Sequence, residues 1–512
     1  MRNRFAMLFL VFVLLVPVIA QDGPTLTVIG TYETGLFDEG AAEIGAYDAA
    51  TQRFFVINAE ADTLDVLDLS DPTAPTLITT ISFEEYGDGV NSVAVFNGLV
   101  AAAVQNEAVD GNGQVVFLNA EGDILGAVEV GVLPDMVTFT PDGTKVLTAN
   151  EGEPAVDYSV DPEGSVSIID IAGGVENATV VTAAFTDITE VPDGVRIYGP
   201  NATIAQDLEP EYVAVSPDSS TAFVTLQENN ALAVIDIASA SVTGIVALGF
   251  KDHSVEGNAL DAGKDDGVIN IANWPIFGVY QPDAIAAYEA NGEVYIVTAN
   301  EGDAREYDTY TEAGEIGEAA LDPETFPNAE ELAQESAIGG MEITIVDADT
   351  DGDGDLDVIY VHGGRSFTIW NLAGQVVFDS GDQFETILAE IYPENFNASN
   401  DDNALDDRSD NKGPEPEGLA LGVIGDQTYA FIGLERIGGV MVYNITDPTA
   451  PAYVTYANNR DFSVTPGEEG AGDLGPEGLV FVSADESPTG TNLLVVTNEI
   501  SGSTTVYELS GF

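Results

Sequence analysis

Short apolar runs separated by turn-forming residues dominate the chain. Residues 165–171, 231–237 and 440–443 are examples, rich in β-branched side chains and flanked by Gly, Asp or Asn. Such runs are typical of β-strands. Helical periodicity is nearly absent, and the pattern at residues 327–336 predicts one short helix. The hydrophobic pattern therefore predicts an all-β protein.

The strands recur in a repeated unit. Each unit opens with Pro beside an acidic residue and a first strand, and its second strand ends in Asn, Glu or both. The clear openings lie at residues 133–135, 209–211, 281–283, 414–418 and 475–478, with weaker copies at 43–69 and 91–118. Repeats of about 40 residues or more with four strands each indicate a β-propeller. We expect one propeller domain over residues 21–512, with seven blades favoured. Eight is the alternative, because residues 341–364 form either an inserted hairpin or part of another blade.

The repeats are longer than compact propeller repeats. Seven blades would have roughly 70 residues each, against about 40 to 45 in compact repeats. The excess lies in loop insertions at residues 156–162, 251–278, 303–339 and 383–412. We also expect residues 26–29 to close the ring by pairing with the last blade.

The N-terminus has the pattern of a targeting segment. Arg2 and Arg4 precede an apolar run at residues 5–19, and small residues lead to Ala20. This predicts a signal peptide at residues 1–20, and its apolar run is too short for a comfortable membrane span. The last residues follow a strand-like pattern with no hydrophobic tail. We therefore expect a secreted, extracellular protein, with the periplasm as the alternative, and no membrane span after signal cleavage.

Charge narrows the classes of partner. The chain of 512 residues has 13 Lys and Arg against 88 Asp and Glu, a formal net charge of −75, and no Cys. The absence of Cys excludes disulfides, thiolate zinc sites and a thiol nucleophile. The charge argues against nucleic acid as a partner, because nucleic-acid binding requires a basic face. It favours divalent cations, although solubility alone is another interpretation of the acidity.

The most specific local motif is an acidic loop at residues 349–357. Asp349, Asp351, Asp353 and Asp357 offer side-chain oxygens at alternating positions, and a carbonyl near Asp355 would complete a Ca²⁺ shell. The twelfth position is Tyr360 rather than Glu, so the loop is not an EF-hand. A solvated acidic turn without a cation is the alternative.

A second candidate site depends on the propeller fold. The loop before each first strand and the loop after each second strand should open at one mouth. The candidate ligand-binding residues there are Glu151, Glu211, Glu228, Glu301, Asp303, Arg305, Arg365, Arg408, Lys412, Glu415, Glu417, Glu435, Arg436, Glu477 and Glu499. Such a mixed funnel suits bound metal, or an anionic small molecule held by Arg and bridged by metal. Salt bridges that hold the blades together are the alternative.

Other candidates have weaker signals. His253 and His362 are the only histidines, and their spacing does not support a zinc site. No residue has the context of a catalytic nucleophile. We therefore assign no catalytic residue, and whether the protein is an enzyme stays open at this point.

Four runs carry a family resemblance, at residues 148–153, 300–305, 363–367 and 412–418. With these runs the chain resembles the choice-of-anchor I family, which includes mesenchyme-specific cell-surface glycoproteins associated with biomineral deposition. The resemblance implies an exported propeller, often held at the surface by a C-terminal anchor. We expect a secreted, calcium-binding protein of extracellular binding or matrix type, whose partner is a surface component.

Some relatives of this family are described as phytase-like or alkaline-phosphatase-like. They suggest an alternative function, a calcium-dependent phosphoesterase. In that alternative the mouth carboxylates hold metal ions, and Arg305, Arg365, Arg408 and Lys412 bind phosphate.

Overall fold

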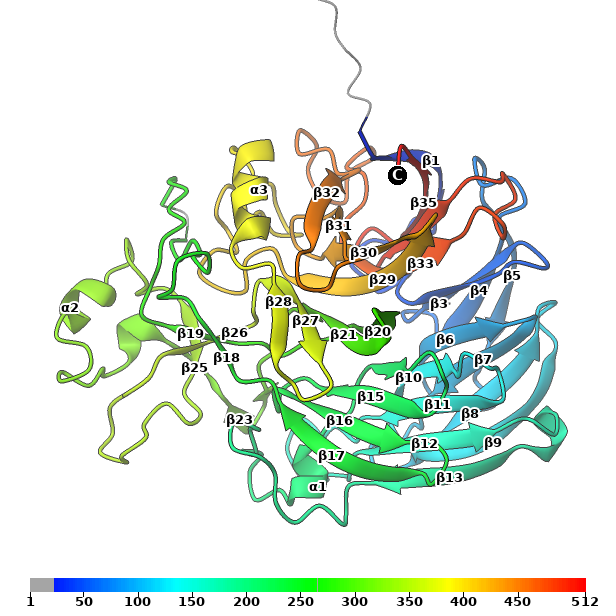
Figure 1. Ribbon diagram of the computed structural model, residues 1–512, viewed down its shortest axis with the longest axis horizontal. Helices are drawn as coiled ribbons and strands as arrows, with labels where there is room; N and C mark the ends of the chain where they lie inside the picture. Colours follow the sequence, from blue (N-terminus) through cyan, green and yellow to red (C-terminus); the bar gives the residue numbers. More distant parts are fainter. Residues whose placement is uncertain (1–22, 265) are drawn as a thin grey trace, which may run out of the picture.

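The computed structural model describes residues 23–264 and 266–512, so the predicted signal peptide lies outside the described residues. Apart from a few short helices, the regular secondary structure of these residues is β-strand, as predicted. Figure 1 shows the sheets arranged around a common centre. The described residues include seven four-stranded antiparallel sheets. Each sheet except the last takes its strands in chain order, as expected for propeller blades.

The first four sheets span residues 45–247. The first sheet consists of β2 (Gly45–Asp48), β3 (Arg53–Asn58), β4 (Thr63–Asp68) and β5 (Thr76–Ser82), and the second of β6 (Val90–Phe96), β7 (Leu99–Val104), β8 (Asn112–Asn119) and β9 (Ile124–Val132). The third sheet consists of β10 (Pro134–Phe139), β11 (Lys145–Asn150), β12 (Ser165–Asp170) and β13 (Thr179–Ala184), and the fourth of β14 (Val213–Val215), β15 (Thr221–Leu226), β16 (Ala231–Asp236) and β17 (Ser241–Ala247).

The remaining three sheets complete the ring. The fifth sheet consists of β20 (Ile285–Ala290), β21 (Glu293–Asn300), β27 (Ser366–Asn371) and β28 (Val376–Asp379). The sixth consists of β29 (Pro416–Ile424), β30 (Gln427–Leu434), β31 (Val440–Asn444) and β32 (Ala452–Ala457). The seventh consists of β33 (Pro476–Val482), β34 (Leu493–Asn498), β35 (Ser503–Ser510) and β1 (Thr25–Glu33). The first strands contact one another in the closed order β2, β6, β10, β14, β20, β29, β33 and back to β2. This order makes the fold a β-propeller.

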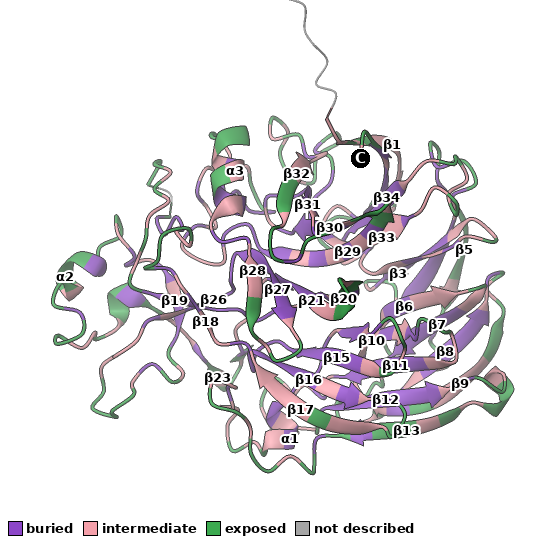
Figure 2. Cartoon of the chain, in the orientation of Figure 1, coloured by how far each residue is buried: buried purple, intermediate pink, exposed green. Residues whose placement is uncertain are grey.

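Burial follows the position of a strand in its sheet. The middle strands β3 and β4 are almost entirely buried, whereas the outer strand β5 is mostly exposed (Figure 2). The reason is that neighbouring sheets pack face to face. Phe55 and Val66 of one sheet, for example, share a core with Val100 and Val116 of the next. Continuous apolar runs therefore mark the middle strands, which are covered on both faces.

The N-terminal strand closes the ring. β1 pairs with β35 in antiparallel register, with Leu26 opposite Leu509 and Thr31 opposite Thr505. This confirms the prediction that residues 26–29 pair with the last blade. The arrangement joins the two ends of the chain in one sheet, so the ring needs no other closure.

Residues of the 251–278 and 303–339 insertions, together with residues 341–364, form a separate unit beside the ring, on the left in Figure 1. A five-stranded sheet has the order β18 (Phe250–Asp252), β19 (Phe277–Val279), β26 (Tyr360–His362), β25 (Glu342–Thr344) and β24 (Ala313–Glu315). Residues 341–364 therefore belong to this sheet, whose β19 and β26 are parallel. Leu260, Ile343 and Val361 lie in its core.

The remaining elements are short. They are the hairpin β22 (Glu306–Tyr307) and β23 (Tyr310–Thr311), the 3-10 helices η1 (Val175–Asn177) and η2 (Ile316–Glu318), and the helices α1 (Ile204–Asp207), α2 (Ala329–Leu332) and α3 (Gln383–Ile391). α2 confirms the helix predicted within residues 327–336. Among residues 23–264 and 266–512, no helix combines the length and apolarity that crossing a membrane requires.

Candidate functional site

Acidic residues occupy one repeated position at the start of the first strands. Pro134, Pro416 and Pro476 each pair with the end of the second strand of their sheet. The residue that follows each Pro is acidic. Across the ring, this position holds Glu43, Asn91, Asp135, Glu211, Asp283, Glu417 and Glu477. Six of the seven sheets therefore place a carboxylate at the same level of the central channel.

A second set of acids follows the second strands. Its members are Glu151, Glu228, Glu301, Glu435 and Glu499. Because the first two strands are antiparallel, the start of one and the end of the other lie at the same edge. The structure accordingly brings carboxylate oxygens of both sets within 4.8 Å of one another in three groups: Glu43, Glu477 and Glu499; Glu151, Glu211 and Glu228; and Asp283, Glu301 and Glu417. A fourth group of the same kind joins Glu301 and Glu435 of the second set to Glu415, which lies outside both sets.

The central channel is hollow at this level. A cavity of about 310 Å³ is lined by Glu43, Asp135, Asp283 and Glu477. Burial, with repulsion from Glu499 and Asp135, raises the pKa of Glu43 to about 8. Burial and the Glu153 carboxylate raise the pKa of Asp135 to about 7. The mouth therefore holds more negative charge than it can keep ionised near neutral pH without cations.

One side of the mouth is neutralised by the protein's own bases. The side chain of Glu415 is fully buried and lies 3.1 Å from Lys412 Nζ, 2.5 Å from Arg408 Nη2 and 3.0 Å from Arg436 Nε. Lys412 also contacts Glu301 at 3.1 Å. Burial alone would raise the pKa of Glu415, but these three cations hold the pKa well below its usual range. This part of the predicted funnel is a compact ion-pair network.

On the opposite side, burial and acidic neighbours outweigh the charge of Arg305, so that the pKa of Glu228 stays raised. Burial raises the pKa of Glu151 well above its ordinary value, and the Asp135, Glu153 and Glu228 carboxylates add to the effect. Burial and repulsion from Glu228 and Glu151 raise the pKa of Glu211 in the same way. Repulsion among these carboxylates favours protonation or an added cation.

Arg305 lies beside this group and is already engaged. Its guanidinium donates to Asp207 at 2.6 Å and to Glu209 at 2.7 Å, and its side chain is 1% exposed. It also stacks over the ring of Tyr198. Arg305 therefore fastens the 303–339 insertion to residues before β14, in the manner of the alternative salt-bridge interpretation.

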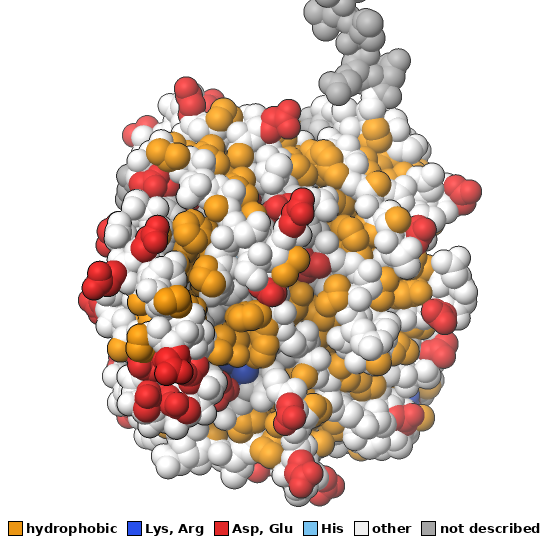
Figure 3. Space-filling model, turned by 60° about the vertical axis from the view of Figure 1, so that its left-hand side comes forward, with side chains coloured by type: hydrophobic (Ala, Val, Ile, Leu, Met, Phe, Trp, Pro, Cys, Tyr) orange, Lys and Arg blue, Asp and Glu red, His pale blue; other side chains and the backbone are white. Residues whose placement is uncertain are grey.

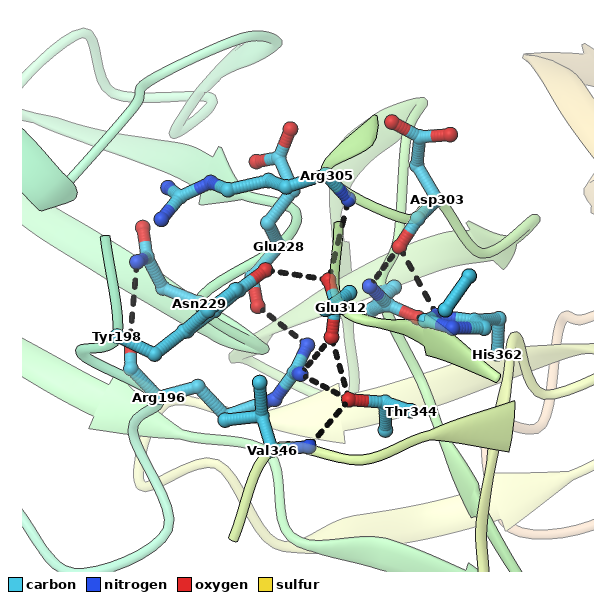
Figure 4. Close-up of polar contacts among 12 residues, drawn as sticks. Arg196, Tyr198, Glu228, Asn229, Asp303, Arg305, Glu312, Thr344, Val346 and His362 are labelled. Carbon is cyan, nitrogen blue, oxygen red and sulfur yellow. Dashed lines mark hydrogen bonds and ion pairs between the residues drawn. The ribbon is translucent and has the colours of Figure 1, made fainter. Parts of the chain in front are cut away.

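A second buried arginine supports the same insertion. Figure 4 shows Arg196 beneath Glu312, to which it donates a hydrogen bond, with Thr344 beside both side chains. The Tyr198 hydroxyl donates to the other Glu312 oxygen at 2.6 Å, and the backbone N–H of Arg305 donates to it at 3.1 Å. Burial opposes ionisation of Glu312, but Arg196 lowers the pKa of Glu312 to about 2.

Arg365 is buried, and its hydrogen bonds join the 383–412 insertion to the 251–278 insertion. It donates to Glu385 at 2.6 Å and to the carbonyls of Asp261, Ser409 and Asn411. Two of the four basic residues predicted to bind phosphate, Arg305 and Arg365, thus have their guanidinium groups committed to internal contacts. Arg408 and Arg436 keep about a quarter of their side chains exposed.

Asp303 is another predicted residue of the mouth, and His362 lies beside it. Burial, together with the Glu228 and Glu301 carboxylates, raises the pKa of Asp303 to about 8 despite the nearby Lys412 ammonium. His362 is buried, and its Nδ1 lies 3.1 Å from the carbonyl oxygen of Asp303. Burial lowers the pKa of His362 to about 4. Within the described residues, neither histidine belongs to a cluster of three potential metal ligands.

The 349–357 loop lies at the surface between β25 and β26. Oxygens of Asp349, Asp351 and Asp353 lie within 4.8 Å of one another. Asp349 accepts hydrogen bonds from the N–H groups of Gly352 and Gly354 at 2.7 and 3.0 Å. Asp357 instead accepts from Thr350, so it is turned toward the loop backbone. Three of the five predicted ligands therefore converge, and calcium binding by this loop stays a prediction.

Sequence reasoning missed several residues of the mouth. Glu43 and Asn91 belong to the two weaker repeats, where no Pro–acid pair marks the position. Asp207 and Glu312 were missed because their partners lie about 100 residues away in the chain. The scarcity of bases was a usable signal for Arg196.

Figure 3 shows acidic side chains scattered over the face in view, where Lys and Arg occupy only small areas.

Comparisons with known proteins give one family and two distant relatives. The model of the choice-of-anchor I domain matches residues 43–448. Gigasin-3a of Magallana gigas is 32% identical over 169 residues, which cover 30% of this chain and 59% of that protein. The mesenchyme-specific cell surface glycoprotein of Strongylocentrotus purpuratus is 27% identical over 282 residues, which cover 48% of this chain and 36% of that protein. The matches thus span less than two thirds of either relative.

Among solved structures, the fold is similar to the β-propeller domain of Cps50 (Swd1) from Myceliophteria thermophila. The TM-score is 0.44 at 7% sequence identity, and the alignment covers 94% of this chain and 99% of that one.

Proposed function

The chain belongs to the choice-of-anchor I family, and from that premise we propose that it is an extracellular or cell-surface propeller that binds calcium and, through calcium, an anionic surface component. One curated relative is named a cell surface glycoprotein, which supports an extracellular location. The predicted signal peptide points the same way.

The observation that carries the proposal is the uncompensated charge at the mouth. Carboxylates from six sheets meet there, and the bases that could neutralise them are concentrated at Glu415 or engaged in the insertions. Carboxylate oxygens are the ligands that Ca²⁺ prefers, and a bound Ca²⁺ keeps open coordination positions for an acidic ligand. The 349–357 loop offers a second calcium site of a structural kind.

The phosphoesterase alternative has less support. It requires basic groups free to bind phosphate, whereas the guanidinium groups of Arg305 and Arg365 are committed to buried partners. A binding protein needs no such group, because calcium itself contacts the anionic ligand.

The experiment is a calcium titration followed by a binding assay. Mature protein stripped of metal with EDTA should bind Ca²⁺ in calorimetry and melt at a higher temperature when Ca²⁺ is added, because ligands that bind only the folded state stabilise it. It should then bind an immobilised acidic polymer with Ca²⁺ and not with EDTA. Absence of Ca²⁺ binding, or equal retention with EDTA, would refute the proposal. Hydrolysis of simple phosphate esters would favour the alternative.

A further inference from the structure

The three carboxylates of Glu151, Glu211 and Glu228 form one of the four acidic groups at the mouth. Glu151 follows β11, Glu211 precedes β14, and Glu228 follows β15, so the group joins two neighbouring sheets. Each residue contributes one oxygen, and these oxygens lie within 4.8 Å of one another. The donors are all carboxylate oxygens, which suit hard cations rather than zinc or copper.

Two of these side chains are buried without a hydrogen-bond partner. Glu211 is 8% exposed and Glu228 is 5% exposed. Within the described part of the chain, Oε2 of each residue makes no hydrogen bond and is closed off from solvent. Buried polar atoms are almost always paired with protein, water or an ion. Two such oxygens in one acidic group favour a partner that carries positive charge over one that is neutral.

The protein supplies that charge only in part. The charge of Arg305 lowers the pKa of Glu228, but its hydrogen bonds go to Asp207 and Glu209, and burial still keeps the pKa of Glu228 raised. The other charges that bear on Glu151 come from Asp135, Glu153 and Glu209, and all of them are negative. The group of Glu301, Glu415 and Glu435 is the internal comparison, because there Lys412, Arg408 and Arg436 take the place that a cation would fill.

We infer that Glu151, Glu211 and Glu228 form a binding site for a hard divalent cation of the calcium class, and that the Glu301–Glu415–Glu435 group does not. The inference rests on the proposed function and assigns the site at which the mouth holds calcium. A point equidistant from three oxygens 4.8 Å apart lies about 2.8 Å from each, so shifts of a few tenths of an ångström reach the Ca–O distance of 2.3–2.6 Å.

The test measures cation binding to four forms of the mature protein after treatment with EDTA. These forms are the wild type, Glu211→Gln, Glu435→Gln as the matched control in the neutralised group, and a double variant of the surface loop, Asp351→Asn with Asp353→Asn. Calcium is titrated by calorimetry, and terbium serves as a luminescent probe of calcium-like size. Thermal melting in EDTA establishes that each variant is folded.

We expect Glu211→Gln to lose one binding event, or to weaken it about tenfold or more, because affinity follows the number of charged ligands. Glu435→Gln and the loop variant should keep that event. Crystals soaked in calcium or terbium should show an anomalous peak among the three carboxylates. Glu228→Gln is the second variant, should Glu211→Gln fail to fold.

The outcomes separate the inference from the function beneath it. If the wild type binds calcium and both Glu211→Gln and Glu228→Gln bind it with unchanged stoichiometry and affinity, the site assignment is wrong and the proposed function stands. The same conclusion follows if the loop variant loses all binding, or if Glu435→Gln alone loses the event. If the wild type binds no calcium, both the site assignment and the proposed function are wrong.

Discussion

Two isosteric substitutions at the mouth should change stability in opposite directions when cations are removed. Glu211 and Glu415 are both buried, and each belongs to a group of three carboxylates. Glu415 is surrounded by three cationic side chains, whereas Glu211 is surrounded by acids. Replacing either Glu with Gln removes one negative charge and almost no volume. The sign of the effect therefore depends on the neighbouring charges.

The magnitudes follow from the geometry. For Glu415→Gln, loss of the anion leaves buried cations without their partner, which costs about 3 to 5 kcal/mol. For Glu211→Gln, each ionised carboxylate 4.8 Å away contributes about 3 kcal/mol of repulsion at an effective dielectric constant near 20. Protonation of the group limits this gain, because holding one glutamate protonated at about pH 7.5 costs about 4 kcal/mol. A gain of about 1 to 3 kcal/mol is therefore expected.

The assay is urea unfolding in EDTA at about pH 7.5, followed by circular dichroism. Exposed Glu107 gives a control variant, Glu107→Gln, that should change the midpoint little. Saturating calcium should reverse the order of wild type and Glu211→Gln, because only the wild type gains the full binding free energy. A loss of stability for Glu211→Gln in EDTA, or shifts of the same sign for both substitutions, would refute the reasoning.

Three further predictions concern other parts of the molecule. Arg305→Met should lower the free energy of unfolding by about 3 to 5 kcal/mol, because the buried carboxylates of Asp207 and Glu209 lose the cation that they share. Limited proteolysis should then cut within residues 303–339, and unchanged resistance to the protease would contradict this. Burial raises the pKa of Asp406 to about 7, so the folded state binds more protons than the unfolded state above about pH 4. Stability should fall by about 3 kcal/mol between pH 4 and 7 on account of Asp406, and Asp406→Asn should flatten the urea-midpoint profile, whereas an unchanged slope would refute it. Asp351→Asn with Asp353→Asn should reduce the calcium-induced rise in melting temperature, and an equal rise would reject the loop as a site.

The ring could be predicted from the sequence because its signals are local. Each Pro–acid pair marks a first strand, and the apolar runs mark the doubly covered middle strands. The partner of β1 also followed from the sequence, since a closed ring leaves one pairing position for it. The separate sheet could not be predicted: β18, β19 and β26 have three residues each, too few for a periodic pattern to appear.

The candidate site could be predicted from the sequence only in part, and for a different reason. The acids repeat with the strands, so their convergence follows once the fold is known. The bases do not repeat, and their partners come from insertions far away in the chain, as Arg305 with Asp207 and Arg365 with Asp261 show. The sequence therefore predicted a mixed funnel, whereas the structure separates a neutralised side from an uncompensated side.

This separation has a consequence for how the protein responds to its surroundings. The insertions use Arg196, Arg305 and Arg365 to fasten themselves to the ring, and each of these bases is removed from the mouth by doing so. The uncompensated carboxylates must then take either protons or cations from the medium. In a calcium-poor medium near neutral pH these carboxylates take up protons, and holding them protonated lowers the stability of the ring. Under the proposed function, calcium in an extracellular medium would replace these protons, and the same residues would then contribute to stability and to ligand binding.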